Sequence, residues 1–462
     1  MKSFLRAAGA SLLCICLLVF GLWRYDAFPD LSGFTAWLQE FKEQTGELIE
    51  ATDDLINGVT GDGNDKTPAK PVESGNEYTG YTPTEEIETD LLTVIRGAYD
   101  DHLESVDISA FELTPEELKT VVSGVRYSCP EYFYVANTYT YSSNTQSGLV
   151  TEFHPAYLVD AETAAAQTET YEQTIAEIVA GAPDGSDFDK VLYLHDYFVQ
   201  NYCYDYTYTI RDAYTFFEQG TGVCQAYMLA FIAVAEAMDI RSIPVTSTEM
   251  NHAWNLVEVD GVWYHMDITW DDSGSYPSFT SYAYFLQSDS GIHNYDVART
   301  DDLSKIHHDW TCSQTASDAR YDSAIWRETI APMTVADGKY YCIVAEAEGK
   351  GGFLFSGEDP LEMAEMLDID GIWKVGNTNS YYPGCYSGLM TIGNDVVYNT
   401  DKILRAYNVV TKKDRLLLLP TLGQAERIYG FYDPDPADGK ISLVVAEKPN
   451  SETYRLIEFS IS

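Results

Sequence analysis

Hydrophobic residues in the first part of the folded region recur mostly at helical spacing. Thr-Pro-Thr-Glu at 82–85 and Thr-Pro-Glu-Glu at 114–117 each place a capping residue before proline and a glutamate three residues after the cap, which is typical of a helix start. These signals and the apolar spacing predict helices over 83–102, 115–126 and 161–181, and one that starts at Ser186.

Segments rich in aromatic and β-branched residues predict strands. Residues 132–141 read as one strand, with 148–159 as its partner. After about residue 320 the pattern changes to short β-rich stretches separated by the turn pairs Asp337-Gly338, Gly393-Asn394 and Asp438-Gly439. We therefore predict a separate, smaller all-β domain over 320–462.

The N-terminal segment has a different pattern. Lys2 and Arg6 precede an apolar run from Ala7 to Trp23, which at roughly 17 residues is near the lower limit for a spanning helix. We predict that 1–26 is an uncleaved signal anchor, with a cleaved signal peptide as the alternative, and that the rest of the chain lies outside the cytoplasm. Residues 33–57 would form an amphipathic stalk helix and 58–81 a flexible linker rich in Gly, Asp, Thr and Pro.

Composition narrows the class of partner. The 462 residues include 28 basic and 72 acidic side chains, for a formal net charge of -44. Such a field repels phosphate backbones, so we expect no nucleic-acid partner. The eight cysteines are scattered, without the C-x-x-C pairs of a zinc site. No disulfide can be assigned from their spacing.

Cys224 is the first candidate for chemistry. Gly222 and Val223 precede it, and an apolar, unbroken run from Met228 to Met238 follows, so the cysteine should lie at or near the N-terminus of a helix. The helix dipole and the free N–H groups at this end favour a thiolate and can stabilise an oxyanion.

A predicted hairpin supplies the partners of the cysteine. Asp260-Gly261 is a strong two-residue turn signal between strands 251–259 and 262–269. Pairing Val259 with Val262 puts Trp254 opposite Asp267 and His252 opposite Thr269, so His252 and Asp267 become diagonal neighbours on one face. His265 lies on the same face but closer to the turn, and we favour His252 as the base.

Three motifs in order resemble one known family. Gly-Val-Cys-x-x-Tyr at 222–227, His-Ala-Trp-Asn at 252–255 and Asp-Gly-x-Trp-Tyr-x-x-Asp at 260–267 are similar to the transglutaminase-like cysteine-enzyme superfamily. The resemblance implies an α+β, papain-like core over 82–315, in which the cysteine-bearing helix packs on an antiparallel sheet. It also implies Cys224 as nucleophile, His252 as base and Asp267 as the orienting carboxylate, with no cofactor.

Other residues carry weaker signals. Tyr204, Tyr206, Gln225 and Trp254 are candidates for an oxyanion or substrate contact. Packing around the triad is the other interpretation of Trp254, and it is the one expected of Trp270. We expect Tyr202 to Tyr208 to alternate along one strand, either lining a substrate cleft or packing in a sheet. His195 reads as a core histidine, Asp271-Asp272 as a turn rather than a calcium site, and His307-His308-Asp309 as a solvated segment rather than a metal site. No metal is expected.

The leading functional hypothesis is amide chemistry through a thioester. The partner would be a protein or peptide, and the reaction peptidase, deamidase or cross-linking chemistry, with water slightly favoured over an amine as the second substrate. The alternative is a non-catalytic surface binding module on the same scaffold. The C-terminal domain could bind a cell-envelope component.

Overall fold

A computed structural model of the chain describes residues 72–73, 88–272, 279–346, 351–374, 380–382, 385–435, 438–449, 451 and 453–461. The chain divides into two compact units, Met1–Asp65 and Lys66–Ser462, and every described residue belongs to the second. The predicted signal anchor, stalk helix and linker lie outside the described residues, apart from 72–73. Among the helices that the structure describes, none has the length and apolar character needed to cross a membrane.

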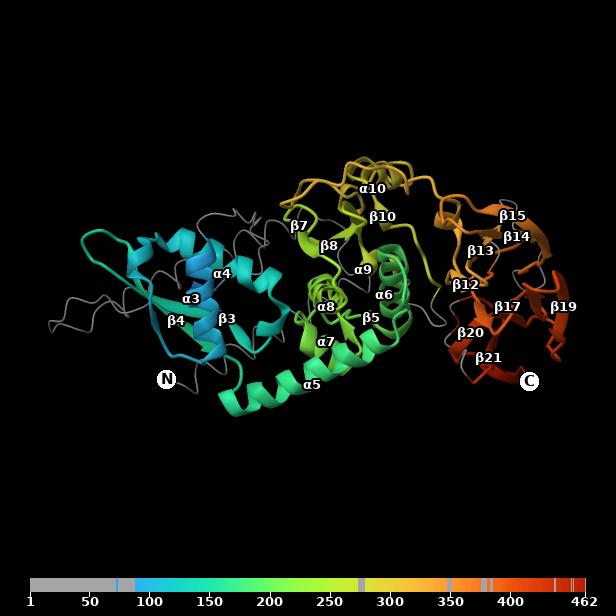
Figure 1. Cartoon of the computed structure of the whole chain (residues 1–462), viewed down its shortest axis with the longest axis horizontal. Coiled ribbons are helices and arrows are strands. Elements are labelled where there is room, and N and C mark those ends of the chain that lie inside the picture. Colours follow the sequence, from blue (N-terminus) through green and yellow to red (C-terminus); the bar gives the residue numbers. More distant parts are fainter. Residues whose placement is uncertain are drawn as a thin grey trace, which may run out of the picture. The chain divides into compact units, whose positions relative to one another are not determined.

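The first layer contains two helices and a small antiparallel sheet of order β1-β3-β4-β2 (Figure 1). The capping box expected at Thr114 forms, because its hydroxyl accepts the Glu117 N–H and its own N–H donates to the Glu117 carboxylate. The predicted strand pair is confirmed as β3 and β4. The elements are α3 (Glu88–Asp100), α4 (Pro115–Ser128), β1 (Val72–Glu73), β2 (Val106–Asp107), β3 (Val135–Ser143), β4 (Val150–Tyr157) and the 3-10 turns η1 (Ser109–Phe111) and η2 (Pro130–Tyr132).

The second layer is helical and surrounds one central helix. Its members are α5 (Ala161–Ala180), α6 (Asp187–Asn201), α7 (Ala213–Gln219) and α8 (Cys224–Ala237). The helix predicted from Ser186 is confirmed, since Ser186 is the N-cap of α6. Helix α8 is buried at every residue from Cys224 to Ala235, as expected of a helix that is apolar on all sides.

Helix α8 packs against a five-stranded antiparallel sheet of order β10-β9-β8-β7-β11. The hairpin register is confirmed from Val259 opposite Val262 to Asn255 opposite Met266. Asp260 and Gly261 both have positive φ, which is the geometry of a tight two-residue turn. The strands are β7 (Ser242–Ser247), β8 (His252–Val259), β9 (Val262–Met266), β10 (Phe285–Gln287) and β11 (Trp310–Thr311).

The predicted second strand of the hairpin is too long. Strand β9 ends at Met266 because Asp267 becomes the N-cap of the short helix α9 (Ile268–Asp271), so the expected pairs of Asp267 with Trp254 and of Thr269 with His252 do not form. Asp271 is therefore the last residue of a helix rather than part of a turn.

The predicted tyrosine strand is also shorter than expected. Only β5 (Cys203–Tyr204) is extended, and it pairs in parallel with β6 (Thr221–Gly222). The chain then turns around Asp205, whose carboxylate accepts the backbone N–H groups of Thr207, Thr209 and Ile210.

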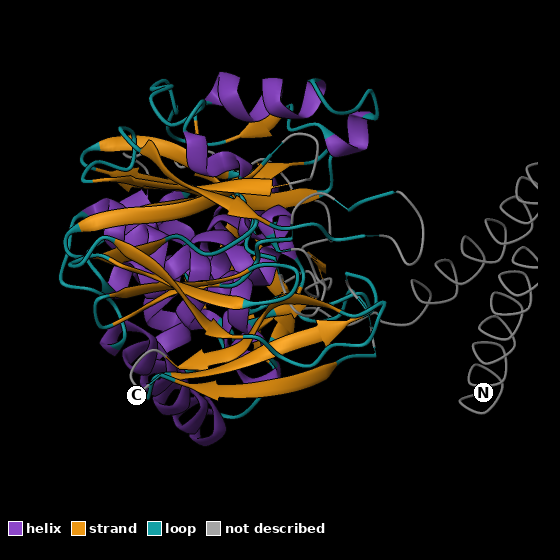
Figure 2. Cartoon of the chain, turned by 90° about the vertical axis from the view of Figure 1, so that its right-hand side faces the viewer, coloured by secondary structure: helices purple, strands orange, loops and turns teal. Residues whose placement is uncertain are grey.

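The C-terminal region is built from antiparallel sheets of order β12-β13-β14-β15, β16-β17-β18-β19 and β20-β21-β22 (Figure 2). This confirms its predicted all-β character. The three turn pairs lie between successive strands, with positive φ at Asp337, Gly338, Gly393 and Gly439. The strands are β12 (Thr334–Ala336), β13 (Lys339–Ala345), β14 (Gly351–Gly357), β15 (Ala364–Asp370), β16 (Leu389–Ile392), β17 (Asp395–Asn399), β18 (Leu404–Asn408), β19 (Lys413–Leu418), β20 (Arg427–Asp435), β21 (Lys440–Ala446) and β22 (Arg455–Ser460).

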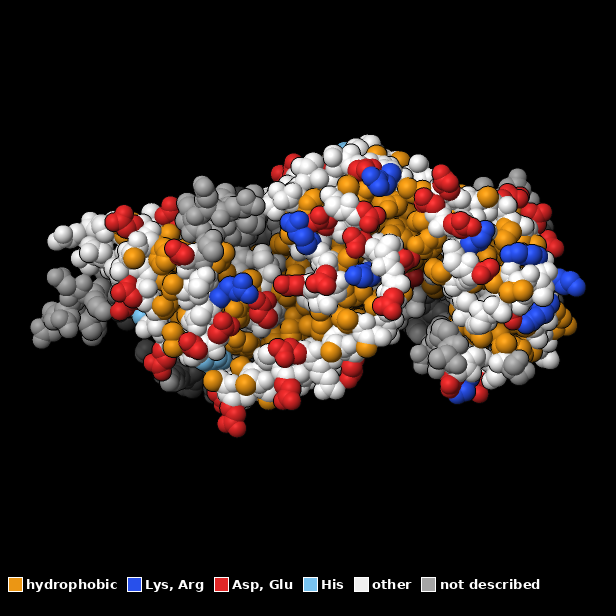
Figure 3. All heavy atoms as spheres, viewed as in Figure 1, with side chains coloured by type: hydrophobic (Ala, Val, Ile, Leu, Met, Phe, Trp, Pro, Cys, Tyr) orange, Lys and Arg blue, Asp and Glu red, His pale blue; other side chains and the backbone are white. Residues whose placement is uncertain are grey.

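Acidic side chains are spread over the face seen in Figure 3 rather than gathered into one patch, with basic side chains scattered between them. This agrees with the sequence composition of 72 acidic and 28 basic residues. Dispersed like charges keep a protein soluble without creating a strong local binding field.

Arg327 connects the segment that follows the five-stranded sheet to the residues around β10. It lies in the 3-10 turn η4 (Ile325–Glu328) and is 7% exposed. Its guanidinium donates to the backbone carbonyls of Tyr282, Ala283, Leu286 and Tyr321. Burial lowers its pKa to about 10. Trp326 beside it belongs to the same hydrophobic core as α8, so this core extends beyond residue 320.

Replacing Arg327 by methionine should destabilise the protein strongly. The change keeps much of the side-chain volume but leaves four buried carbonyls without their donor, and each unpaired buried group costs about 1–3 kcal/mol. We expect the free energy of unfolding, measured by urea titration, to fall by at least about 3 kcal/mol. The control Arg320→Met removes an ion pair to Asp318 at the surface and should cost less than about 1 kcal/mol. Equal losses in the two variants would contradict this role of Arg327.

Candidate active site

Cys224 is the first residue of α8 and is 5% exposed. Two glycines make its position attainable. Gly220 closes α7 with φ of 69°, and at Gly222 a Cβ atom would come within 2.6 Å of the Phe216 ring and 2.7 Å of the Ala226 Cβ. The chain can therefore turn tightly into α8 only because these positions carry no side chain.

The loop before Cys224 is held by the turn around Asp205. The Val223 N–H donates to the Ile210 carbonyl at 2.9 Å, and the Asp205 N–H donates to the Gly222 carbonyl at 2.9 Å. The first N–H groups of a helix have no partner within it. The backbone N–H of Cys224 is the first of these groups in α8.

His252 and Asp267 come together as predicted, although by a different backbone path. Nε2 of His252 lies 2.6 Å from Oδ2 of Asp267, and both side chains are buried. Burial lowers the pKa of His252, but the charge and hydrogen bond of Asp267, together with a hydrogen bond to Cys224, outweigh burial and raise it above its ordinary value. Burial alone would raise the pKa of Asp267, yet His252 and a second histidine hold it well below its usual range.

Two tryptophans fix the plane of the His252 ring. Trp254 and Trp270 are both stacked on it, with ring centroids 5.5 and 5.2 Å away. The backbone N–H of Trp270 also donates to Oδ1 of Asp267 at 3.2 Å. Trp254 is 1% exposed, so its predicted role in packing agrees with its position.

His265 supports Trp254 rather than the cysteine. Its Nδ1 accepts the indole N–H of Trp254 at 2.9 Å, and its Nε2 lies 2.8 Å from Oδ1 of Asp289. An acceptor nitrogen carries no proton, so Nε2 is the donor and the ring is neutral. Burial lowers the pKa of His265, which agrees with this tautomer.

His307 is the residue that the sequence analysis placed wrongly. It was expected in a solvated segment, but it is 0% exposed and its Nε2 lies 3.0 Å from the same Asp267 oxygen that contacts His252. Its Nδ1 lies 2.7 Å from Oδ2 of Asp296, which also accepts the His307 backbone N–H. Only Asp309 of that segment is exposed. The nearest sequence signal is the hydrophobic neighbour Ile306, which is buried beside it.

Asp296 continues this network into α10 (Asp289–Val297). It accepts a hydrogen bond from the Tyr284 hydroxyl at 2.8 Å, and it is 1% exposed. The ligand atoms of His252, Asp267 and His307 lie within 4.8 Å of one another, close enough for a metal ion. Their contacts of 2.6 and 3.0 Å are nevertheless ordinary hydrogen-bond distances.

A fourth buried histidine, His195, anchors the helix that Asp267 caps. Nδ1 of His195 in α6 lies 2.9 Å from Oδ1 of Asp196, and its Nε2 lies 3.3 Å from Oδ2 of Asp271. The residue is 0% exposed. Asp271 ends α9, so this contact holds the far end of the helix whose first turn Asp267 caps. His195 is thus a core histidine with polar partners.

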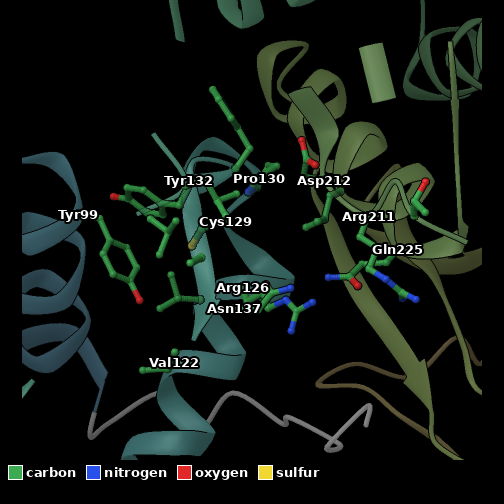
Figure 4. Close-up of a pocket in the computed structure, with 17 residues that line it drawn as sticks. Tyr99, Val122, Arg126, Cys129, Pro130, Tyr132, Asn137, Arg211, Asp212 and Gln225 are labelled. Carbon is green, nitrogen blue, oxygen red and sulfur yellow. The ribbon is translucent and has the colours of Figure 1, made fainter. Parts of the chain in front are cut away.

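The remaining candidates lie at different depths. Tyr204 is half-buried, and burial together with the charge of Cys224 raises its pKa. Tyr206 is 71% exposed and packs edge-on against Tyr204. Gln225 is buried in α8 and lines a pocket with residues of α4 (Figure 4). Tyr204 is therefore the more buried of the two tyrosines.

Comparison with protein families matches residues 172–268 to the transglutaminase-like superfamily. The matched span holds Cys224, His252 and Asp267, and it confirms the resemblance found in the sequence motifs. No curated protein matches the sequence.

Two solved structures resemble part of the chain. A crystal structure of a TGase is 17% identical with a TM-score of 0.21, covering 26% of this chain and 41% of the other. A candidate cysteine protease from Cytophaga hutchinsonii is 16% identical with a TM-score of 0.19, covering 26% of this chain and 51% of the other. The chain thus spans about half of these solved chains or less, and neither likeness extends to their full length.

The buried network predicts a large stability loss when His307 is replaced by phenylalanine. The ring volume is kept, but Asp267 and Asp296 each lose a charged or polar partner. Removing one partner from a buried pair costs about 3–5 kcal/mol. We expect a loss of this size in the free energy of urea unfolding. His308→Phe, which changes the neighbouring ring that is 18% exposed, should cost less than about 1 kcal/mol. A His307→Phe midpoint equal to that of the unaltered protein would show that the network does not stabilise the fold.

Proposed function

We propose that the transglutaminase-like segment is the core of a thiol enzyme that acts on protein or peptide amides through a thioester on Cys224. The contact of 2.6 Å between His252 and Asp267, beside a cysteine at a buried helix N-terminus, carries the proposal. Nε2 of His252 is taken by Asp267, so Nδ1 is the nitrogen left for the thiol.

In the first half-reaction, Cys224 gives its proton to His252 and its sulfur attacks the carbonyl carbon of the amide. The Cys224 backbone N–H stabilises the negative oxygen of the tetrahedral intermediate. The C–N bond then breaks, the nitrogen takes the proton from His252 and leaves as an amine or ammonia, and a thioester remains.

In the second half-reaction, water or an amine attacks the thioester and passes a proton to His252. The C–S bond breaks, and the sulfur leaves as a thiolate that His252 reprotonates or holds as an ion pair. Water as acceptor gives peptidase or deamidase chemistry, and an amine gives a cross-link. Asp267 keeps the imidazole in one orientation through both steps.

We also propose that this domain works outside the cytoplasm, attached through residues 1–26. The support is the sequence pattern of two basic residues before an apolar run. The linker at 58–81 would then separate the enzyme from the membrane surface, where protein or peptide substrates of the cell envelope are accessible.

The pH dependence of thiol alkylation tests the activated cysteine. A raised His252 pKa keeps the imidazole protonated over the neutral range, and its positive charge stabilises the thiolate of Cys224. Iodoacetamide should therefore label Cys224 rapidly well below pH 8.5, about the ordinary thiol pKa. Peptide mass spectrometry gives the rate at each pH. Cys203 is exposed and free, and serves as the reference thiol within the same molecule.

The variant His252→Ala should give Cys224 a slow, strongly pH-dependent rate, whereas His308→Ala should leave its profile unchanged. If the rate at Cys224 does not respond to His252, the thiol is not activated, and a binding module becomes the better explanation.

Product analysis separates catalysis from mere thiol reactivity. A glutamine-containing peptide incubated with the protein should lose ammonia in a Cys224-dependent manner, giving glutamate in water and a secondary amide when methylamine is added. Cys224→Ser should abolish both products, while Cys203→Ser should keep both. Absence of both products with a reactive Cys224 would restrict the proposal to peptide-bond cleavage, which the shortening of the same peptide would reveal.

A further inference from the structure

A pocket of about 230 Å³ lies beside the first two turns of α8 (Figure 4). We call it the arginine pocket, because Arg126 of α4 and Arg211, just before α7, both line it, together with Gln225 and Asn137. Pockets that enclose drug-sized ligands measure roughly 300–1,000 Å³. The arginine pocket is smaller, and its size fits a single side chain or a chain terminus.

The side chain of Gln225 is a buried amide at the edge of this pocket. It is 2% exposed and lines the pocket. An amide that faces a cavity can form hydrogen bonds with a polar group that enters from outside. Gln225 follows the nucleophile candidate directly, and that group would therefore lie close to the thiol.

The charge of the side chains that line the pocket indicates which kind of ligand group it binds. The Arg211 guanidinium donates to the Tyr208 carbonyl at 3.3 Å, and no carboxylate of the described chain pairs with it. Arg126 points toward Gln225 across the pocket in Figure 4. Guanidinium groups bind carboxylates through two parallel hydrogen bonds. Two arginines in one small pocket are notable in a chain with 28 basic and 72 acidic residues.

One carboxylate also lines the pocket. Asp212 is the N-cap of α7, where its Oδ1 accepts the Thr215 N–H at 2.7 Å. This oxygen is directed at the helix rather than at the two guanidinium groups. Counting all charged side chains of the lining, the two arginines outnumber Asp212, and the pocket favours an anion.

The arginine pocket is electrostatically connected to the thiol. Burial raises the pKa of Tyr127, and the charges of Arg126, Cys224 and Arg211 all act on this same hydroxyl. Tyr204 is likewise affected by both Cys224 and Arg211. Gln225 lines the pocket and directly follows Cys224 in α8, so a substrate residue in the pocket would lie near enough to the thiol to share one peptide with the reacting amide.

We propose that the arginine pocket is a specificity subsite that binds the carboxylate of an acidic residue next to the amide attacked by Cys224. Arg126 and Arg211 bind the carboxylate, and Gln225 donates its amide N–H to it. This inference rests on the proposed thiol chemistry, and it narrows the substrate class to acidic peptides. Attraction in the pocket opposes the overall repulsion of an anion by the chain's net charge of -44.

Matched electrophiles test the subsite without knowledge of the natural substrate. N-iodoacetyl-glutamic acid amide and N-iodoacetyl-glutamine amide have nearly the same shape and differ in that only the first carries a side-chain carboxylate. A second pair of probes has one glycine after the iodoacetyl group, which moves the carboxylate one residue further from the reacting carbon. The second-order rate of Cys224 labelling is measured for each probe. We expect the glutamate probe of at least one spacing to react about ten-fold faster than its glutamine partner, the size expected for one hydrogen bond to a charged group.

The ratio of the glutamate and glutamine rates is then compared among variants, so that any general change in thiol reactivity cancels. Arg211→Gln, Arg126→Gln and Gln225→Leu should each bring the ratio close to one. Arg241→Gln removes the same charge from an exposed side chain paired with Glu258 and should keep the ratio. Added salt should lower the ratio of the unaltered protein, because it screens the charges.

The outcomes separate the two proposals. If iodoacetamide itself fails to label Cys224 rapidly, the proposed thiol chemistry is wrong. If Cys224 is activated but both spacings give equal rates for glutamate and glutamine probes, the arginine pocket does not bind a carboxylate. If Arg241→Gln abolishes the preference for the glutamate probe as fully as Arg211→Gln does, the preference comes from net charge, and the proposed subsite is also wrong.

Discussion

The site depends on one fully buried carboxylate. Asp267 caps α9, accepts from the His252 ring and contacts the His307 ring, all from within the protein interior. An isolated carboxylate there would be protonated, because burial disfavours its charge. The two imidazoles reverse this preference. The position of His252, the path of the chain at the end of β9 and the segment that contains His307 are therefore all set by the need to satisfy a single charged group.

The network around Asp267 alternates imidazole and carboxylate. His252, Asp267, His307 and Asp296 follow one another through hydrogen bonds, and Tyr284 ends the series. Each carboxylate lies between donors, so neither is left uncompensated in a medium of low dielectric. Around it, Trp254 and Trp270 exclude water and fix the ring of His252. The same exclusion strengthens the electrostatic interactions inside the site.

Local sequence signals predicted the parts of this arrangement that local chemistry determines. The Asp260-Gly261 turn set the hairpin register, the Ser186 cap began α6, and the glycines before Cys224 placed it at a helix start. The errors share a cause. Asp267 and Asp205 each use a side chain to accept backbone N–H groups, and this capping ended strands that the apolar pattern alone would have continued. His307 was missed because its partners are distant in sequence, and two adjacent histidines carry no periodic pattern.

The fold class and the proximity of His252 and Asp267 could thus be predicted from the sequence. The contact of His307 with Asp267 and the arginine pocket could not. A pocket between segments as separate as α4 and the start of α7 has no signature along the chain. It exists only because α4, η2 and α8 share one hydrophobic core.

The contrast between the thiol helix and the pocket bears on how the proposed function can diverge. Cys224, the proposed nucleophile, begins a helix buried on every side, behind a glycine that tolerates no side chain, so substitutions there disturb the whole interior. Arg126 and Arg211, in contrast, project from α4 and from a loop, and both are only partly buried. Under the two proposals, selection can exchange the substrate residue that is recognised while the reacting atoms stay in place. Relatives would be expected to keep the thiol helix and to vary at these two positions, which makes them the natural points for redesigning substrate choice.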